Sequence, residues 1–215
     1  MKPVGVFGGT FDPIHYGHLR TAFELLEGLE LEQIRFIPAA RPPHRDAPGA
    51  DAELRLAMVR AATEAQPGFV VDDRELRRAG PSYTVLTLAE LRAELGPRPI
   101  CLVVGMDAFT GLPSWHRWQE LLELAHLVVA HRPGWNAPES GQLGGLLQAR
   151  RADRVSELHD SPVGRILVRP VTQLEISSTR LRGIVASGRD LRYLVPEPVR
   201  AIINETACYT RQGMR

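Results

Sequence analysis

The chain lacks the features that mark secreted, membrane and nucleic-acid-binding proteins. It has 215 residues and only two cysteines, Cys101 and Cys208, and neither has the setting of a disulfide partner or a nucleophile. No uninterrupted apolar stretch approaches the ~20 residues that a membrane helix needs, and no apolar signal segment precedes the first expected strand. A net charge of +1 provides no strong basic field. We therefore expect a cytoplasmic protein without a nucleic-acid or membrane partner.

The composition fits one globular domain spanning residues 1–215. Hydrophobic residues make up 44% of the chain, which is enough for a single good core. The segment 133–162 is rich in Gly, Ala, Pro and Arg, and only Leu143–Ala149 within it has a clear helical pattern, so we interpret it as an insertion of unknown role. The local cluster of Arg74, Arg77 and Arg78 is expected on a solvated surface.

Apolar strand patterns alternate with helical patterns along most of the chain. This alternation predicts an α/β fold, a Rossmann-like doubly wound parallel sheet of five to six strands with helices on both faces and a small C-terminal helical part at 176–215. The expected strands are Val4–Phe7, Ile34–Pro38, Phe69–Asp72, Ile100–Val104, His126–Ala130 and Arg165–Val168. The expected helices are His18–Leu29, Ala50–Ala65, Tyr83–Leu95, Trp118–Leu124, Ser178–Ser187 and Pro196–Glu205.

The most informative segment is Gly8-Gly9-Thr10-Phe11-Asp12-Pro13-Ile14-His15-Tyr16-Gly17-His18, which follows the first expected strand. Glycines at a strand end allow backbone N–H groups to approach an anion closely. The imidazoles of His15 and His18 lie at the start of a helix, where unpaired N–H groups and the helix dipole already favour negative charge. The segment is therefore typical of a phosphate-binding site.

Other interpretations of this segment are open. A His-x-x-His pair can bind zinc, but no nearby cluster of Cys or carboxylates completes a set of four ligands. Both histidines could simply cap the helix, although His is a modest capping residue. Thr10 and Asp12 are also typical turn residues, and we expect Asp12 to hydrogen-bond to its own local backbone.

A second polar motif, Ile176-Ser177-Ser178-Thr179-Arg180-Leu181-Arg182, begins an expected helix near the C-terminus. Ser and Thr at a helix start provide hydroxyls beside free backbone N–H groups, and Arg182 adds a planar charged group one turn later. This combination suits a triphosphate. The alternative is an ordinary N-cap followed by a solvated basic helix face.

The two motifs together resemble a known family. Gly-x-Phe-Asp-Pro followed by His-x-Gly-His is similar to the nucleotidyltransferase superfamily, and Ile-Ser-Ser-Thr-x-x-Arg is similar to the pyridine-nucleotide adenylyltransferases within it. The resemblance is greatest to the bacterial nicotinate mononucleotide adenylyltransferases. It implies that the substrates are ATP, carrying Mg²⁺, and nicotinate mononucleotide, and that the products are deamido-NAD and pyrophosphate, a step of NAD biosynthesis.

The resemblance also implies roles for the residues of the two motifs. His15, His18 and Arg182 become catalytic residues that contact the phosphates of ATP. Asp107, in the Gly-x-Asp turn after the fourth strand, is assigned to the adenosine or to the acceptor ribose. No protein ligand for Mg²⁺ is evident, although Asp107 is close enough in the expected fold to be considered as one. The remaining residues assigned to ATP are Gly8, Gly9, Thr10, Phe11, Gly105, Ile176, Ser177, Ser178 and Thr179.

Three further segments are similar to the acceptor-binding parts of the family. Pro38–Arg45 resembles a Pro-Pro-His-Lys loop with His44 retained and Arg45 in place of lysine. Pro81-Ser82-Tyr83-Thr84 matches the turn beside the pyridine carboxylate, and in Leu112–Trp118 the resemblance implies that Trp115 stacks on the base while Trp118 packs in the core. The residues assigned to the acceptor are His44, Arg45, Ser82, Tyr83, Thr84, Trp115 and Arg132.

The sequence leaves some alternatives open. Phosphopantetheine adenylyltransferase and the FMN or glycerol-phosphate nucleotidyltransferases share the first motif, and a catalytically silent nucleotide-binding module could share the fold. The sequence does not decide between nicotinate and nicotinamide mononucleotide. The sequence also does not decide the oligomeric state of the protein, and a homo-oligomer is possible.

Overall fold

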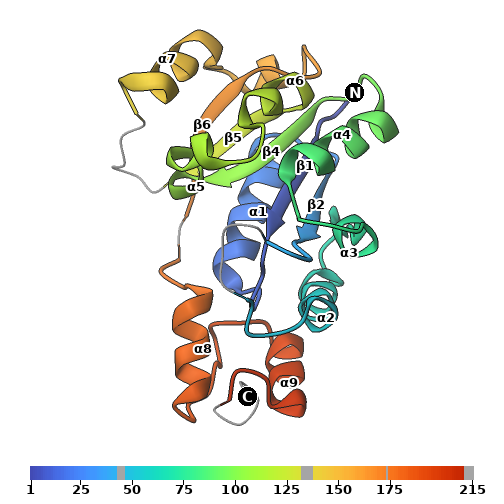
Figure 1. The fold of residues 1–215 in the computed structure, drawn as a ribbon, viewed down its shortest axis with the longest axis vertical. Coiled ribbons are helices and arrows are strands. Elements are labelled where there is room, and N and C mark those ends of the chain that lie inside the picture. Colours follow the sequence, from blue (N-terminus) through green and yellow to red (C-terminus); the bar gives the residue numbers. More distant parts are fainter. Residues whose placement is uncertain (43–46, 132–137, 173, 211–215) are drawn as a thin grey trace.

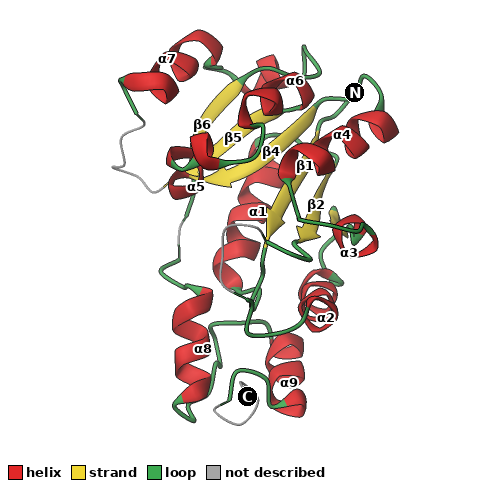
Figure 2. Ribbon diagram, viewed as in Figure 1, coloured by secondary structure: helices red, strands yellow, loops and turns green. Residues whose placement is uncertain are grey.

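The structure is a computed structural model that describes residues 1–42, 47–131, 138–172 and 174–210. Six parallel strands form one sheet with the order β3-β2-β1-β4-β5-β6 (Figures 1 and 2). The strands are β1 (Val4–Gly9), β2 (Gln33–Pro38), β3 (Phe69–Val71), β4 (Ile100–Gly105), β5 (His126–His131) and β6 (Ile166–Pro170). The predicted fold class is confirmed.

The strand order reverses between β1 and β4, which are neighbours although two strands separate them in sequence. At such a reversal the loops that follow the two strands leave toward opposite faces of the sheet and open a crevice beyond the carboxyl ends of the strands. The first predicted motif follows β1, and the Gly-x-Asp turn follows β4. The topology therefore brings both segments to one edge of the sheet.

Helices occur at every predicted position, with ends that differ by a few residues. They are α1 (Tyr16–Gly28), α2 (Ala52–Thr63), α4 (Thr84–Leu95), α6 (Leu121–Leu124), α7 (Gly141–Arg150), α8 (Ser178–Ala186) and α9 (Glu197–Thr206). Two predicted starts shift because caps decide them: His15 is the N-cap of α1, and Asp51 accepts the N–H of Leu54 at the start of α2. The predicted start of α8 at Ser178 is confirmed, with Ser177 as its N-cap. Two short helices were not predicted, α3 (Arg74–Arg77) and α5 (Met106–Thr110).

The core lies on both faces of the sheet. Along β4, Cys101 and Val103 belong to the cluster on one face, while Leu102 and Val104 belong to the cluster on the other. This alternation explains why the sequence of β4 is continuously apolar, as expected for a parallel strand covered on both sides. Cys101 is buried, and burial raises the pKa of its thiol to about 12, so it acts as an apolar core residue.

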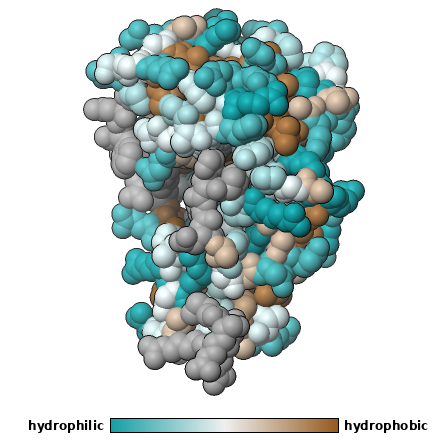
Figure 3. Space-filling model, in the orientation of Figure 1, coloured by the Kyte–Doolittle hydropathy of each residue, from teal (hydrophilic) through white to brown (hydrophobic). Residues whose placement is uncertain are grey.

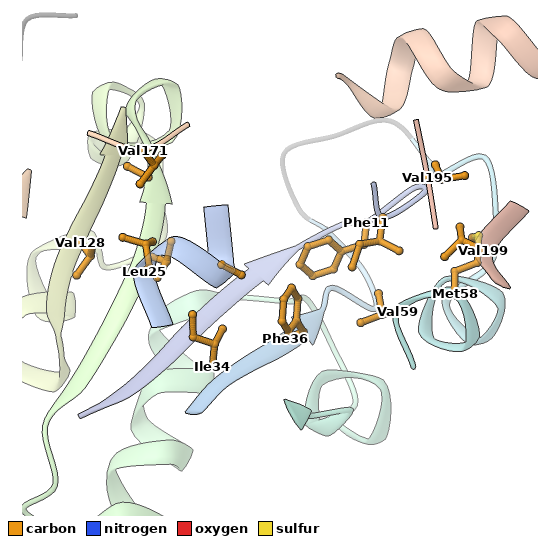
Figure 4. Close-up of a cluster of buried hydrophobic side chains, with 14 of the residues drawn as sticks. Phe11, Leu25, Ile34, Phe36, Met58, Val59, Val128, Val171, Val195 and Val199 are labelled. Carbon is orange, nitrogen blue, oxygen red and sulfur yellow. The ribbon is translucent and has the colours of Figure 1, made fainter. Parts of the chain in front are cut away.

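The first cluster continues beyond the sheet and fixes the C-terminal helices. Phe11 and Phe36 face each other with ring centroids 6.0 Å apart, and Met58 of α2 lies beside Val199 of α9 (Figure 4). In Figure 1, α8 and α9 lie beyond the carboxyl ends of β1 and β2. The C-terminal part of the chain is therefore packed next to the segment that follows β1.

The face of the molecule that Figure 3 shows is mainly polar. On the face shown in Figure 3, hydrophobic residues form small groups among hydrophilic ones. Within the described part of the chain, no helix combines the length and the apolar character needed to cross a bilayer.

Close packing of β1 against β2 leads to a prediction for Gly5. A Cβ atom there would lie 2.8 Å from Cγ1 of Ile34 and 2.9 Å from Cδ1 of Leu31. Gly5→Ala is therefore expected to lower the free energy of unfolding by about 1–3 kcal/mol in urea titrations. Gly145→Ala on α7, where a Cβ meets nothing within 4 Å, serves as the control and should raise stability by about 0.5–1 kcal/mol. Equal stability of Gly5→Ala and wild type would contradict the packing argument.

Candidate functional site

A large cleft opens beyond the carboxyl ends of β1 and β4, with a volume of about 1140 Å³. Its walls come from the segment that joins β1 to α1, the turn between β4 and α5, and the segment that leads into α8. Every residue that the sequence assigned to ATP or to catalysis lines this cleft: Gly8, Gly9, Thr10, Phe11, His15, His18, Gly105, Asp107, Ile176, Ser177, Ser178, Thr179 and Arg182. The fold thus brings the two motifs together around one cavity.

His15 and His18 form a stacked pair at the start of α1. Their ring centroids are 3.7 Å apart with an angle of 24° between the planes. The backbone N–H of His15 donates to Nδ1 of His18 at 3.3 Å, so the neutral ring of His18 carries its proton on Nε2. Phe7 and Phe11 contact the His18 ring edge to face, with centroids 6.1 and 5.2 Å away. The orientation of the His18 ring is therefore well determined.

The capping interpretation agrees with the backbone contacts at the start of α1. His15 occupies the N-cap position, and His18 accepts the backbone N–H of that cap. Both rings nevertheless line the cleft. A helix start can be capped by a small Ser or Asp, so two stacked imidazoles on a cavity wall provide ring N–H groups that capping alone does not need.

His15 is neutral at physiological pH. Its side chain is buried, and burial lowers the pKa of the imidazole to about 4. Its Nδ1 atom has no hydrogen-bond partner among the described residues. Gly17 leaves little room beside the ring, because a Cβ there would lie 3.0 Å from Cε1 and Nδ1 of His15. The glycine of the His-x-Gly-His motif is thus required by the position of the first imidazole.

Asp12 joins the two motifs, and the prediction that it bonds to its own local backbone is wrong. Its carboxylate accepts the N–H groups of Gly49 and Ala50 at 2.8 and 3.1 Å and the hydroxyl of Tyr209 at 2.7 Å. Arg182 forms an ion pair with it at 3.3 Å and donates to the Asp12 carbonyl oxygen at 2.8 Å. These partners are distant in sequence, so local turn preferences could not reveal them.

Tyr209 completes this arrangement from the end of the described chain. Its side chain is buried, and burial together with the neighbouring Asp12 carboxylate raises the pKa of its hydroxyl. The hydroxyl therefore stays protonated and keeps donating to Asp12. The C-terminal part of the chain is in this way attached directly to the segment after β1.

The hydroxyls of the second motif have structural partners in the free protein. Ser177 accepts the N–H of Arg180 at 3.3 Å as the N-cap of α8, and Ser178 Oγ donates to the carbonyl of Pro13 at 3.0 Å. Thr179 Oγ1 accepts from Arg182 Nη2 at 3.4 Å. The first turn of α8 carries no acidic residue, so no carboxylate within that turn neutralises the positive end of the helix dipole, which lies at the cleft. The motif combines a helix N-terminus with one guanidinium.

The described residues assigned to the acceptor, Ser82, Tyr83, Thr84 and Trp115, lie outside the lining of this cleft. Ser82 exchanges two hydrogen bonds with the backbone of Arg41, at 3.1 and 3.0 Å, which ties the loop after β2 to the start of α4. Tyr83 stacks on His116 with ring centroids 4.2 Å apart. Tyr83 and Trp115 are both half-buried, and both pack against the core cluster that contains Leu102 and Val104 of β4. Thr84 is the first residue of α4. We call Ser82, Tyr83, Thr84, Trp115 and His116 the acceptor-side group.

Some assignments lie outside the described residues or differ from expectation. His44, Arg45 and Arg132 lie outside the described residues. Trp118 packs in the core as predicted. Arg74 and Arg78 are not freely solvated: each side chain is largely covered, and they pair with Asp72, Glu94 and Glu90. Burial opposes the charge of Asp72, but hydrogen bonds from Arg74 outweigh it and keep the pKa of that carboxyl below its usual value.

Sequence reasoning missed Arg55, the largest fully buried side chain, and His116, the stacking partner of Tyr83. Arg55 has a helical position among apolar residues, Leu54, Leu56 and Met58, and that position is the only signal in the sequence that could have identified it. A charged residue within the apolar face of a helix predicts that the side chain is buried with hydrogen-bond partners, but it does not predict which residues those partners are.

The burial of His15 predicts a pH dependence of stability. The imidazole has a pKa near 6.5 in the unfolded chain and about 4 in the fold, so the unfolded state binds the proton first as the pH falls. Between these two values the free energy of unfolding should decrease by up to about 3 kcal/mol from this group alone. Urea unfolding at several pH values should show a smaller decrease for His15→Gln than for wild type. Identical pH dependences would contradict the assignment.

Comparison with known proteins agrees with this geometry. A family model described as cytidylyltransferase-like matches residues 6–184. A probable nicotinate-nucleotide adenylyltransferase of Aeromonas hydrophila is 49% identical over 207 residues, which are 96% of this chain and 97% of the relative. One of the same name from Methylococcus capsulatus is 46% identical over 209 residues, covering 97% of this chain and all of the relative (100%).

A solved structure also shares the fold. Plasmodium falciparum nicotinic acid mononucleotide adenylyltransferase complexed with NaAD aligns with a TM-score of 0.73 over 97% of this chain and 98% of that chain, at 14% sequence identity. At that identity the likeness concerns the fold alone. With the match to the family model and the near full-length relatives, it follows that the chain belongs to the cytidylyltransferase-like family and, within it, to the bacterial nicotinate-nucleotide adenylyltransferases.

Proposed function

We propose that the protein transfers the adenylyl group of ATP to nicotinate mononucleotide in the cleft beyond β1 and β4, giving deamido-NAD and pyrophosphate for NAD biosynthesis. The observation that carries this proposal is the convergence of the two motifs. His15 and His18 come from the start of α1 and Arg182 from α8, yet all three line one cavity, and Arg182 is bound to Asp12 of the first motif. One polyphosphate can therefore contact both motifs.

The reaction needs positioning and charge stabilisation more than acid–base chemistry. A phosphate oxygen of nicotinate mononucleotide attacks the α-phosphorus of ATP, a P–O bond forms, and the bond to the β-phosphate oxygen breaks to release pyrophosphate. The attacking oxygen is already ionised near neutral pH, so no general base is required. Negative charge accumulates on the α-phosphate and on the leaving group, and fixed hydrogen-bond donors there lower the barrier.

His18 and His15 are the donors proposed for the α- and β-phosphates. Because Nδ1 of His18 accepts a backbone N–H, Nε2 is the ring atom that we propose as the donor to a phosphate oxygen. His15 stacks on it as a neutral ring with a low pKa. His15 therefore keeps one protonation state across the physiological pH range.

The rest of the cleft is proposed to bind the remainder of ATP. The N-terminus of α8 and Arg182 bind the β- and γ-phosphates, with Ser177, Ser178 and Thr179 shaping that turn. The residues proposed for the nucleoside and the α-phosphate are Gly8, Gly9, Thr10, Phe11, Gly105, Asp107 and Ile176.

The acceptor-side group is proposed to receive nicotinate mononucleotide. Its aromatic side chains and the N-terminus of α4 suit a flat ring that carries a carboxylate. His44, Arg45 and Arg132 belong to the same proposal through the loops that follow β2 and β5.

Magnesium enters with the triphosphate in this proposal. Among the described residues, no group of three or more His, Cys, Asp or Glu side chains is placed to hold a metal ion. A Mg²⁺ ion that arrives on ATP needs few protein ligands, because phosphate oxygens and water supply most of its six positions. Asp107 is a carboxylate on the cleft wall that could approach such an ion.

We also propose that residues 1–215 act as one nucleotidyltransferase domain. Leu143 and Leu147 of α7 pack into the core cluster that contains β4 and β5, so the described part of segment 133–162 shares a core with the sheet. Residues 176–215 likewise supply both the second motif and Tyr209.

The function is tested with a panel of acceptors. Purified protein with Mg²⁺ and ATP is given nicotinate mononucleotide, nicotinamide mononucleotide or phosphopantetheine, and release of pyrophosphate and formation of dinucleotide are measured. We expect the highest kcat/KM with nicotinate mononucleotide. Activity confined to phosphopantetheine would place the enzyme in a different branch, and no activity with any acceptor would favour a nucleotide-binding module.

Removal of the His18 donor should lower turnover with little effect on folding. His18→Ala is expected to reduce kcat by a factor of ~100 or more, because one lost transition-state donor is typically worth ~3 kcal/mol. Steady-state kinetics on variant protein with an unchanged circular dichroism spectrum measures this effect. Near-normal turnover of the folded variant would remove His18 from the reacting centre.

A further inference from the structure

Arg55, on α2, lies buried beneath the segment that follows β1. Only 1% of its surface is exposed, and its guanidinium donates to three backbone carbonyls. Nη1 donates to Thr10 at 2.6 Å, Nε to Ala50 at 3.2 Å and Nη2 to Ala40 at 3.4 Å. These carbonyls belong to the segment after β1, the entry to α2 and the loop after β2. One side chain therefore connects three segments at the same edge of the sheet.

Burying a guanidinium to hold a loop costs free energy of desolvation. Burial lowers the pKa of Arg55, and the nearby Asp12, Tyr209 and Asp51 offset only part of that cost. Apolar side chains of similar volume often replace buried charges with no loss of stability. The fork of N–H groups, by contrast, fixes the orientation of the peptide groups that it contacts. An apolar residue at position 55 could fill the same space, but it could not fix the orientation of the Thr10 carbonyl group.

The shortest of these hydrogen bonds fixes the peptide between Thr10 and Phe11. This peptide is trans, so its C=O and N–H point in opposite directions. The carbonyl points toward the buried Arg55, and the N–H of Phe11 therefore points away from it, toward the cleft that both residues line. That N–H donates no hydrogen bond to any described residue.

The backbone at Phe11 also needs support. Its φ of 48° lies in the left-handed region that a bulky residue rarely adopts. Such a conformation persists only when surrounding contacts hold it, and here the buried Phe11 ring and the Thr10 carbonyl bond flank the strained residue. Loss of the bond to Arg55 would leave this peptide free to rotate toward a more relaxed conformation.

We propose that Arg55 is a positioning residue that aims the backbone N–H of Phe11 at a phosphate of the bound nucleotide and keeps the loop after β2 in register with it. This inference rests on the proposed function for the identity of the nucleotide. Arg55 itself does not line the cleft, so it acts through the peptide that it holds.

Arg55→Lys and Arg55→Met test this role in the full-length protein. A lysine keeps the charge, but its three N–H donors share one nitrogen and cannot reach three carbonyls that Arg55 contacts through three separate nitrogens. Methionine keeps most of the volume without a donor. We expect kcat to fall ~10–100-fold for Arg55→Met and less for Arg55→Lys, since a misplaced donor of this kind typically costs up to ~100-fold. The KM for ATP should rise by a smaller factor.

Arg60→Met is the matched control on the same helix. The Arg60 side chain is 59% exposed and pairs only with Asp73 among the described residues. Its kcat should stay within about twofold of wild type. A merely structural Arg55 would lower activity only in proportion to the folded fraction, so a folded Arg55→Met with wild-type kcat overturns the proposal.

A measurement on wild-type protein tests the target of this positioning, and can overturn the proposal, even if the Arg55 variants fail to fold. The amide of Phe11 is followed in ¹H–¹⁵N spectra while Mg²⁺ and a non-hydrolysable ATP analogue are added. A shifted Phe11 amide that exchanges more slowly with water supports the proposal, and an unperturbed one overturns it. This readout needs no acceptor, so it can succeed even where the acceptor panel shows no transfer and the proposed function fails.

Discussion

The buried carboxylate of Asp12 is the contact on which the whole site depends. It gathers two backbone N–H groups near the start of α2, the hydroxyl of Tyr209 and the guanidinium of Arg182. Removing one partner from a buried ion pair typically costs about 3–5 kcal/mol, because the other charge is left without compensation. The first motif, the second motif and the C-terminal part of the chain therefore keep their relative positions as one unit.

The proposed phosphate site carries no large positive charge. Arg182 is partly neutralised by Asp12, the imidazole of His15 is neutral, and the helix N-termini add partial positive charge. Such partial charges act over short range, whereas a basic surface attracts any polyanion. A net charge of +1 is consistent with a site that relies on local donors.

The sequence predicted the sheet, the longer helices and the lining of the cleft, because these depend on periodicity and on the rule that ligands bind beyond the carboxyl ends of parallel strands. It did not predict α3 and α5, which are too short to show a helical period. It also failed at Asp12 and Arg55. Their partners lie up to 197 residues away in sequence for Asp12 and 45 for Arg55, and local preferences carry no information on such contacts.

The cleft and the acceptor-side group, the two proposed substrate regions, are connected through a short chain of hydrogen bonds. Arg55 binds the carbonyls of Thr10, on the wall of the cleft, and of Ala40, in the loop after β2. The next residue of that loop, Arg41, exchanges two hydrogen bonds with Ser82 of the acceptor-side group. In-line attack requires the acceptor phosphate and the α-phosphate to be aligned within a fraction of an ångström. The path of five residues from Thr10 through Arg55, Ala40 and Arg41 to Ser82 couples the two regions, because a shift of either one strains the hydrogen bonds that join it to the other.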